Sequence, residues 1–157
     1  MSLFSSPSKR QIDLGLTILR IVVGIIFVAH GGQKLFVFGL DGVAAGFGQM
    51  GMPMAGLLGP LAAFVEFFGG FALIAGLVTR LAALGLASTM LVATLVVHLK
   101  NGFFNPGGIE FTLSLLASTS FLALTGAGKW SLDALIGRRS DAVAAVSSEK
   151  VKLRRAA

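Results

Sequence analysis

The chain has 157 residues, of which 55% are hydrophobic and 13% are charged, and its mean hydropathy is +0.86. Soluble domains are about 25% charged, so this balance excludes an ordinary soluble protein and indicates an integral membrane protein. The absence of cysteine excludes disulfides, thiolate catalysis and cysteine-bound iron–sulfur clusters. The net charge of +6 comes from the termini and short loops, which is typical of a topology signal and not of nucleic-acid binding.

Residues 1–13 form a polar leader that contains Lys9 and Arg10. A cleaved signal peptide is the alternative interpretation of this end of the chain. Arg20, however, interrupts the apolar run that follows, no convincing small-x-small cleavage pattern comes after it, and the run is longer than the apolar region of a typical signal peptide. We therefore expect an uncleaved first membrane span.

Four apolar segments follow one another along the chain, at residues 16–38, 57–78, 81–99 and 109–124. Most approach the roughly 20 residues that cross a hydrocarbon core of about 30 Å, and the fourth is short enough to cross only if upright. Glycine is frequent inside them and permits close contact between membrane helices. The sequence predicts an all-α fold, an integral membrane four-helix bundle over residues 14–136, followed by a basic tail at 137–157.

The connections between the segments differ in character. Residues 39–56 place Phe47, Met50 and Met54 at helical spacing, so a short interfacial helix and an irregular surface loop both remain open. Thr79 and Arg80 join the second and third spans so tightly that these spans should be antiparallel neighbours. Residues 100–108 carry Asn-Gly, Asn-Pro and Gly-Gly steps, which are typical of turns.

The distribution of basic residues predicts the orientation of the bundle. With both termini on one side, every lysine and arginine except Lys34 and Lys100 falls on that side or in the membrane half next to it. Because positively charged loops stay in the cytoplasm, we expect both termini to be cytoplasmic. The basic tail is then expected to lie on the membrane surface, attracted to anionic lipid.

Polar side chains concentrate in the outer half of the predicted bundle. His30 lies about 12 Å, and Glu66 about 13 Å, below the outer ends of their spans at 1.5 Å per residue. Lys34 is one helical turn above His30 on the same face. His98, Asn101 and Glu110 belong near the outer mouth. These six residues therefore predict one polar pocket, centred on His30 and Glu66.

Each of these residues also has a purely structural interpretation. The Glu66 carboxyl can pin helix packing, Lys34 can extend to the interface, and His98 can be an interfacial or capping residue. Glu110 can complement the helix dipole of the fourth span. Because ionisable residues inside membranes usually mark functional sites, we favour a functional role for His30 and Glu66.

The residue types present limit the chemistry of such a pocket. The two histidines differ in depth by about 10 Å, which is too far apart for both to ligate one haem iron. The sequence also lacks the Glu-x-x-His repeat that is typical of a di-iron centre. We therefore expect no haem, iron–sulfur or metal cofactor. An imidazole, a carboxyl and an ammonium in an apolar wall suit a neutral amphipathic ligand that exchanges protons, and a quinone is the leading candidate. His30 and Glu66 would then be the proton-exchanging pair.

Several blocks of the sequence, in this order and spacing, resemble the DoxX family of small four-span bacterial inner-membrane proteins. The matching blocks are Leu19-Arg20 with Gly24, His30-Gly31-Gly32-Gln33-Lys34-Leu35, Val65-Glu66-Phe67-Phe68-Gly69-Gly70, Gly76-Leu77-Val78-Thr79-Arg80, His98-Leu99-Lys100-Asn101-Gly102-Phe103-Phe104 and Trp130-Ser131-Leu132-Asp133. The resemblance implies redox chemistry at the quinone pool, because members are linked to a thiosulfate:quinone oxidoreductase, to catechol stress and to oxidant defence.

The leading hypothesis is a quinone-linked redox subunit or accessory protein of the bacterial inner membrane, acting with a soluble redox partner. The alternative is a non-enzymatic membrane scaffold that recruits soluble redox proteins. Passage of a small solute or proton is disfavoured, because apolar side chains are expected to seal the inner half of the bundle. The expected partners are the lipid bilayer and such a soluble protein, with no nucleic acid.

Overall fold

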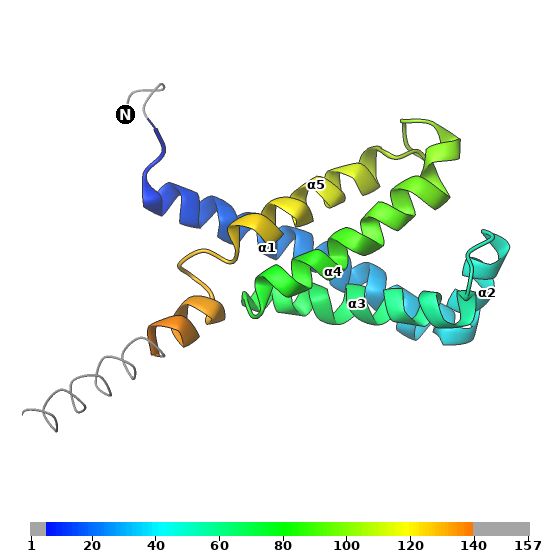
Figure 1. The fold of residues 1–157 in the computed structure, drawn as a ribbon, viewed down its shortest axis with the longest axis horizontal. Coiled ribbons are helices and arrows are strands. Elements are labelled where there is room, and N and C mark those ends of the chain that lie inside the picture. The colour runs from blue at the N-terminus through cyan, green and yellow to red at the C-terminus, as the bar shows by residue number, and fades with distance from the viewer. Residues whose placement is uncertain (1–5, 140–157) are drawn as a thin grey trace, which may run out of the picture.

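The computed structural model describes residues 6–139, and this part of the chain is all-α, as predicted (Figure 1). The helices are, in chain order, α1 (Lys9–Gly32), the π-helical η1 (Gln33–Phe38), α2 (Gly39–Gln49), α3 (Ala55–Ala75), α4 (Thr79–Val92), the π-helical η2 (Ala93–His98), the 3-10 turn η3 (Leu99–Asn101) and α5 (Glu110–Thr125). Residues 132–139 are also helical. The basic tail lies outside the described residues, apart from its first three positions.

Within residues 6–139, three stretches of helix are long and apolar enough to cross a membrane: Lys9–Gln49, Ala55–Ala75 and Thr79–Asn101. They contain the first and third predicted spans, and all of the second except its last three residues, because α3 ends at Ala75. The fourth predicted span corresponds to α5, which has only 16 residues and is a shorter apolar helix.

Helix α1 begins seven residues before the predicted first span. Ser8 and Gln11 form a capping box: the Ser8 hydroxyl accepts from the Gln11 amide, and the Gln11 side chain accepts from the Ser8 amide at 2.8 Å. This reciprocal arrangement satisfies the free amide groups of the first turn. Part of the expected polar leader is therefore the first turn of a helix.

The segment between the first two spans contains a helix, so the irregular loop is excluded. Gly39 has φ +68, where the chain turns from η1 into α2. Helix α2 then packs on α3 through Val43, which is buried, and a Cβ at Gly59 would lie only 3.2 Å from the Val43 carbonyl oxygen. Of the three apolar residues at helical spacing, Phe47 lies in α2, whereas Met50 and Met54 come after its end.

The helices associate in two pairs, α1 with α3 and α4 with α5 (Figure 1). We call the end with the start of α1 and the end of α5 the terminal end, and the end with α2 and residues 99–109 the loop end. The α1 and α3 backbones come very close at Gly24 and Gly70, since a Cβ on Gly24 would lie 2.7 Å from the Gly70 carbonyl oxygen. This is the close packing that glycine was expected to allow.

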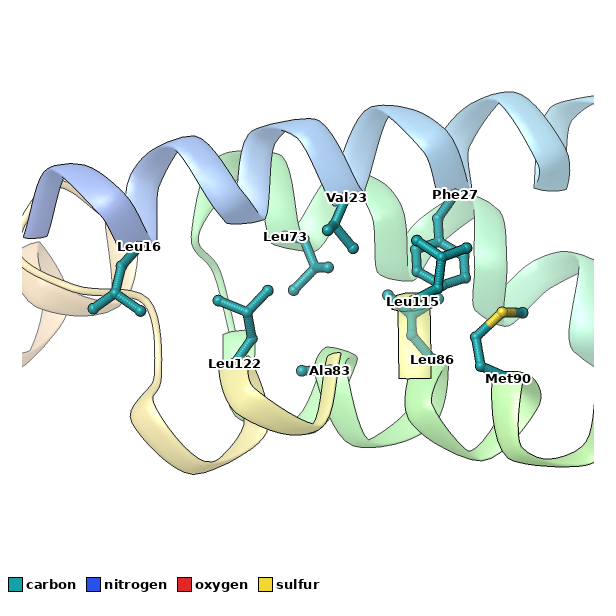
Figure 2. Packing of buried hydrophobic residues seen from close by; sticks show 9 residues of the cluster. All are labelled: Leu16, Val23, Phe27, Leu73, Ala83, Leu86, Met90, Leu115 and Leu122. Atoms are coloured by element: carbon teal, nitrogen blue, oxygen red, sulfur yellow. The ribbon is translucent and has the colours of Figure 1, made fainter. Parts of the chain in front are cut away.

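Apolar packing fills the region from the middle of the bundle to the terminal end (Figure 2). The buried cluster consists of Leu16, Val23, Phe27, Leu73, Ala83, Leu86, Met90, Leu115 and Leu122. It includes side chains from all four long helices, so the two helix pairs share one core.

A buried arginine joins the helix ends at the terminal end. Arg20 is only 3% exposed, and its guanidinium donates to the carbonyl oxygens of Leu73 and Trp130. Asp133 accepts hydrogen bonds from the amides of Val78 and Thr79, at 2.7 and 2.9 Å, and so caps the start of α4. These bonds hold residues 128–139 against the bundle.

Candidate functional site

A cavity of about 460 Å³ lies between α3 and α4 at the loop end. Its walls come from α3, α4 and η2, with contributions from η1, α2 and the turn after α2. Most of the lining is apolar, and the ionisable residues in it are Lys34, Glu66 and His98. Three of the six residues predicted to form a polar pocket therefore meet at one cavity.

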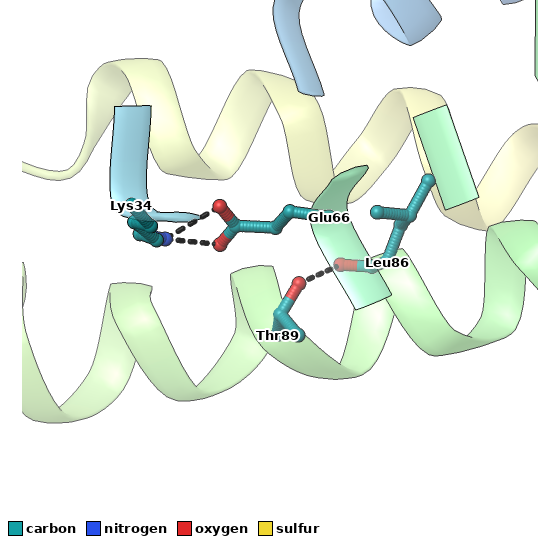
Figure 3. A network of polar contacts seen from close by, with 4 residues as sticks. All are labelled: Lys34, Glu66, Leu86 and Thr89. Carbon is teal, nitrogen blue, oxygen red and sulfur yellow. Dashed lines mark hydrogen bonds and ion pairs between the residues drawn. The ribbon is translucent and has the colours of Figure 1, made fainter. Parts of the chain in front are cut away.

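Lys34 and Glu66 form an ion pair at this cavity (Figure 3). The Lys34 Nζ lies 2.5 Å from each of the two carboxyl oxygens of Glu66. The Glu66 side chain is 3% exposed and the Lys34 side chain 25% exposed. Because a buried charge is costly unless it is paired, the contact with Lys34 compensates for the burial of the Glu66 carboxyl in this apolar wall.

The close contact of α1 with α3 brings these two groups together. A Cβ on Gly31 would overlap the backbone of Phe67, the residue that follows Glu66. Gly31 thus lets α1 approach α3 at the level of Glu66, and Lys34 follows one turn later, in the π-helical η1. His98 ends the second π-helical segment, η2. Such wide turns occur frequently at functional sites because they redirect side chains.

The cavity ends near Glu66 because α3 and α4 pack tightly beyond it. A Cβ on Gly69 would lie 3.1 Å from Leu86, and at the edge of the cavity a Cβ on Gly85 would lie 3.3 Å from Val65, which also lines it. On the α4 wall, the hydroxyl of Thr89 donates to the carbonyl oxygen of Leu86 at 2.8 Å (Figure 3). Thr89 therefore satisfies its own donor within the helix and leaves the ion pair as the main polar feature of the inner wall.

His98 connects the cavity to the loop between η3 and α5. Its Nδ1 lies 2.7 Å from the carbonyl oxygen of Gly107. Since a carbonyl oxygen only accepts hydrogen bonds, Nδ1 is the donor, and Nε2 is left as the other polar atom of the ring. The Asn101 side-chain amide donates to the same oxygen at 3.1 Å, and Glu110 accepts from the amide of Asn105 at 2.8 Å. Asn101 and Glu110 thus organise this loop and do not line the cavity.

His30 is exposed and also lies outside the cavity lining. Its ring is 5.9 Å from that of Phe111 on α5. Both carboxyl oxygens of Glu66 are bonded to Lys34, and the hydrogen bonds described for residues 6–139 include none between His30 and Glu66. Proton exchange by His30 with Glu66 stays a prediction, and Lys34 is the partner that the structure gives to Glu66.

Two other hollows, of about 540 and 510 Å³, lie at the terminal end. One is lined by Lys129, Trp130 and Arg138, and the other by Arg80 and Asp133. Asp133 is engaged in capping α4. Of the three hollows, the one at the loop end is the one that contains a buried ion pair.

The sequence profile of the DoxX family matches residues 15–99, which include most of α1, all of α2, α3 and α4, and both π-helical segments. The chain belongs to the DoxX family. The matched stretch also contains every ionisable residue that lines the cavity, so this site is built within the part of the chain that defines the family.

Curated members of the DoxX family are similar over most of their length. A Bacillus subtilis protein with the name "Putative oxidoreductase CatD" is 33% identical over 87% of this chain and 99% of the relative. The inner membrane protein YqjF of Escherichia coli is 32% identical over 83% of this chain and 98% of the relative. A Mycobacterium tuberculosis membrane protein, Rv3486, is 32% identical over 81% of this chain and 84% of the relative. No solved structure matches this chain.

Sequence reasoning missed the contribution of the α2 segment to the site of this DoxX-family protein. Phe47, Met50 and Met52 all line the cavity. The sequence left a short interfacial helix and a surface loop both open for this segment, and the helical spacing of Phe47 and Met50 was the available signal for one shared face. With them, the cavity has an apolar wall and one polar end, which suits a ligand with an apolar body and a hydrogen-bonding head.

Proposed function

We propose that this protein binds a quinone in the cavity between α3 and α4 and acts as a quinone-linked redox subunit or accessory protein of the bacterial inner membrane. The observation that carries this proposal is the Lys34–Glu66 ion pair in the wall of an otherwise apolar cavity. The names of two relatives support the proposed location and the proposed redox role, since YqjF is called an inner membrane protein and CatD a putative oxidoreductase.

The polar groups match the two forms of a quinone. The ammonium of Lys34 donates to a carbonyl oxygen of the oxidised ring, and the carboxylate of Glu66 accepts from a hydroxyl of the reduced ring. A quinone takes up two electrons and two protons to become a hydroquinone. This chain supplies the binding site and the groups that exchange protons, including His30 as predicted, and a soluble redox partner supplies the electrons.

The apolar groups match the body of the same ligand. Met50 and Met52 provide flexible, polarisable surfaces that make favourable contacts with ring edges. Phe47 adds an aromatic face to the wall. Together these side chains hold the ring by contacts that do not depend on its redox state, while the ion pair distinguishes the two forms.

We also propose that the protein crosses the membrane four times with both termini in the cytoplasm. Helix α5 has 16 residues and a length of about 24 Å, so the bilayer must thin slightly around it. Among the described residues, the terminal end carries Lys9, Arg10, Arg80, Lys129, Arg138 and Arg139. The loop end carries Lys100 and the paired Lys34, and this imbalance supports the proposed orientation.

The binding experiment uses the full chain in lipid nanodiscs and decylubiquinone as the probe. We expect wild type to bind, and Glu66→Gln and Lys34→Met each to weaken binding by about 10- to 100-fold, the equivalent of one hydrogen bond to a charged group. Asp41→Asn, which changes an exposed acid on α2, is the control and should bind as wild type does. Failure of wild type to bind, or wild-type affinity in both pair variants, would overturn the proposal.

A further inference from the structure

The exposed residues of the cavity lining show where the cavity opens. They are Leu61 on α3, and Ser88 and Val92 on α4. Leu61 is 51% exposed and Val92 is 40% exposed, whereas the lining residues other than these three are buried or half-buried. The mouth therefore lies on the flank of the molecule, between two helices.

The other directions into the cavity are covered by side chains. At the loop end, Phe47, Met50 and Met52 are half-buried and form a lid over the space between α3 and α4. Toward the terminal end, the contacts of Gly69 with Leu86 bring α3 and α4 together. A ligand that entered from the aqueous phase at the loop end would have to displace the lid, whereas the flank is already open.

The mouth lies at the depth of the hydrocarbon core. Leu61 is six residues from the start of α3, or about 9 Å along the helix, and Val92 is nine residues from the end of the Thr79–Asn101 stretch, or about 14 Å. With a hydrocarbon core of about 30 Å, both positions face lipid chains and not water. The neighbouring exposed side chains Leu57 and Leu95 are apolar as well.

From this geometry, and resting on the proposed function, we infer that the cavity is loaded sideways from the bilayer through the gap between Leu61 and Val92. The substrate class is then a lipid-soluble quinone with an alkyl or isoprenoid chain. Its ring reaches the Lys34–Glu66 pair, and its chain leaves through the mouth and remains among the lipid chains. The ion pair selects the head of the ligand, and the position of the mouth selects for the tail.

The test measures the association rate of decylubiquinone with the full chain in nanodiscs. Leu61→Trp and Val92→Trp place an indole in the mouth and should slow association by about tenfold or more. Phe64→Trp and Leu91→Trp are the matched controls, because these residues are exposed on the same two helices but do not line the cavity. The controls should associate at the wild-type rate.

A second set of variants avoids substitutions that disturb folding. The chain contains no cysteine, so Val92→Cys and Leu91→Cys can each be labelled after folding with a bulky lipophilic maleimide. The label at position 92 should block association, and the label at position 91 should not.

The outcomes separate this inference from the proposed function. Slow association confined to the mouth variants supports lateral loading. Association at the wild-type rate in all labelled and tryptophan variants, with affinity for decylubiquinone intact, would overturn lateral loading and leave quinone binding in place. Absence of decylubiquinone binding in wild type would contradict both lateral loading and the proposed function. A tailless ring analogue that binds as tightly as decylubiquinone, at equal concentrations in the membrane, would contradict the role of the tail.

Discussion

The ammonium of Lys34 lies 2.5 Å from both carboxyl oxygens of Glu66, across the contact between α3 and η1, the π-helical segment that follows α1. The two side chains are unequally buried, at 25% and 3% exposure. Lysine can move its flexible chain toward more polar surroundings, whereas Glu66 cannot leave the helix interface. The pair thus connects the packing of two membrane helices to the polar end of a cavity. Because the two side chains are unequally buried, loss of Lys34 and loss of Glu66 have different consequences.

Breaking this pair should destabilise the protein. Glu66→Gln should cost about 3 kcal/mol, at the lower end for a buried pair, because Lys34 is one-quarter exposed and can rehydrate. Lys34→Met should cost at least as much, since it leaves Glu66 buried without a partner. The double variant should be more stable than the sum of the single effects predicts, by about 1 kcal/mol or more. Unfolding titrations in mixed micelles measure these differences, and additive effects would contradict the coupling.

The two histidines should differ in their effects on ligand binding. His98→Asn keeps a donor for the Gly107 carbonyl oxygen but removes the imidazole ring from the cavity lining, so we expect a several-fold weaker affinity for decylubiquinone. His30→Asn changes an exposed residue outside the lining and should alter binding less, even if it slows proton exchange. The same nanodisc titration compares them, and a larger loss of affinity at His30 would support the pocket centred on His30 and Glu66 that the sequence predicts.

Helix packing at Gly24 can be tested with a matched glycine on the same helix. A methyl group at Gly24 would collide with the Gly70 carbonyl oxygen and the Ile74 side chain at 2.7 Å, so Gly24→Ala should cost about 1–3 kcal/mol. Gly15→Ala is the control, because nothing lies within 4 Å of a Cβ there. It should be neutral or slightly stabilising, since alanine favours helix more than glycine does. Equal thermal stability of the two variants would contradict the close contact.

The cap that Asp133 provides for α4 is a third local test of stability. Asp133→Ala removes the acceptor for the Val78 and Thr79 amides and should lower the free energy of unfolding by about 1 kcal/mol. Asp41→Ala removes an exposed acid from α2 and should have little effect. The readout is the denaturant midpoint, together with the rate at which added protease cleaves residues 128–139. An unchanged cleavage rate would mean that this segment is held by other contacts.

The proposed orientation can be tested with single cysteines in this cysteine-free chain. A membrane-impermeant maleimide added to intact cells should label Gln49→Cys, which is exposed near the loop end, and should not label Ser6→Cys, near the start of α1. After the cells are opened, both should react. Labelling of Ser6→Cys in intact cells would reverse the orientation inferred from the basic residues.

The residues of the candidate site differ in how far the sequence could predict them. Lys34, Glu66 and His98 were identified as a polar set because charged groups are rare in apolar spans. Their grouping was only partly predicted, since matching depths along straight helices say how high a residue lies but not which way it faces. The π-helical turns of η1 and η2 rotate Lys34 and His98 around the helix axis relative to a regular α-helix. The spacing of apolar residues in the sequence does not predict the size of this rotation.

Composition and apolar periodicity alone determined that this is an all-α protein with long membrane-type helices, because such segments satisfy their own backbone hydrogen bonds in any surroundings. The tertiary structure decided which side chains meet: Glu66 with Lys34, Arg20 with the carbonyl oxygens of two separate segments, and the methionines after α2 with the cavity. These contacts depend on the rotation and separation of whole helices, which glycine contacts such as Gly31 against Phe67 set at a few points. Such contacts form between residues far apart in the chain, and for that reason local sequence does not encode them.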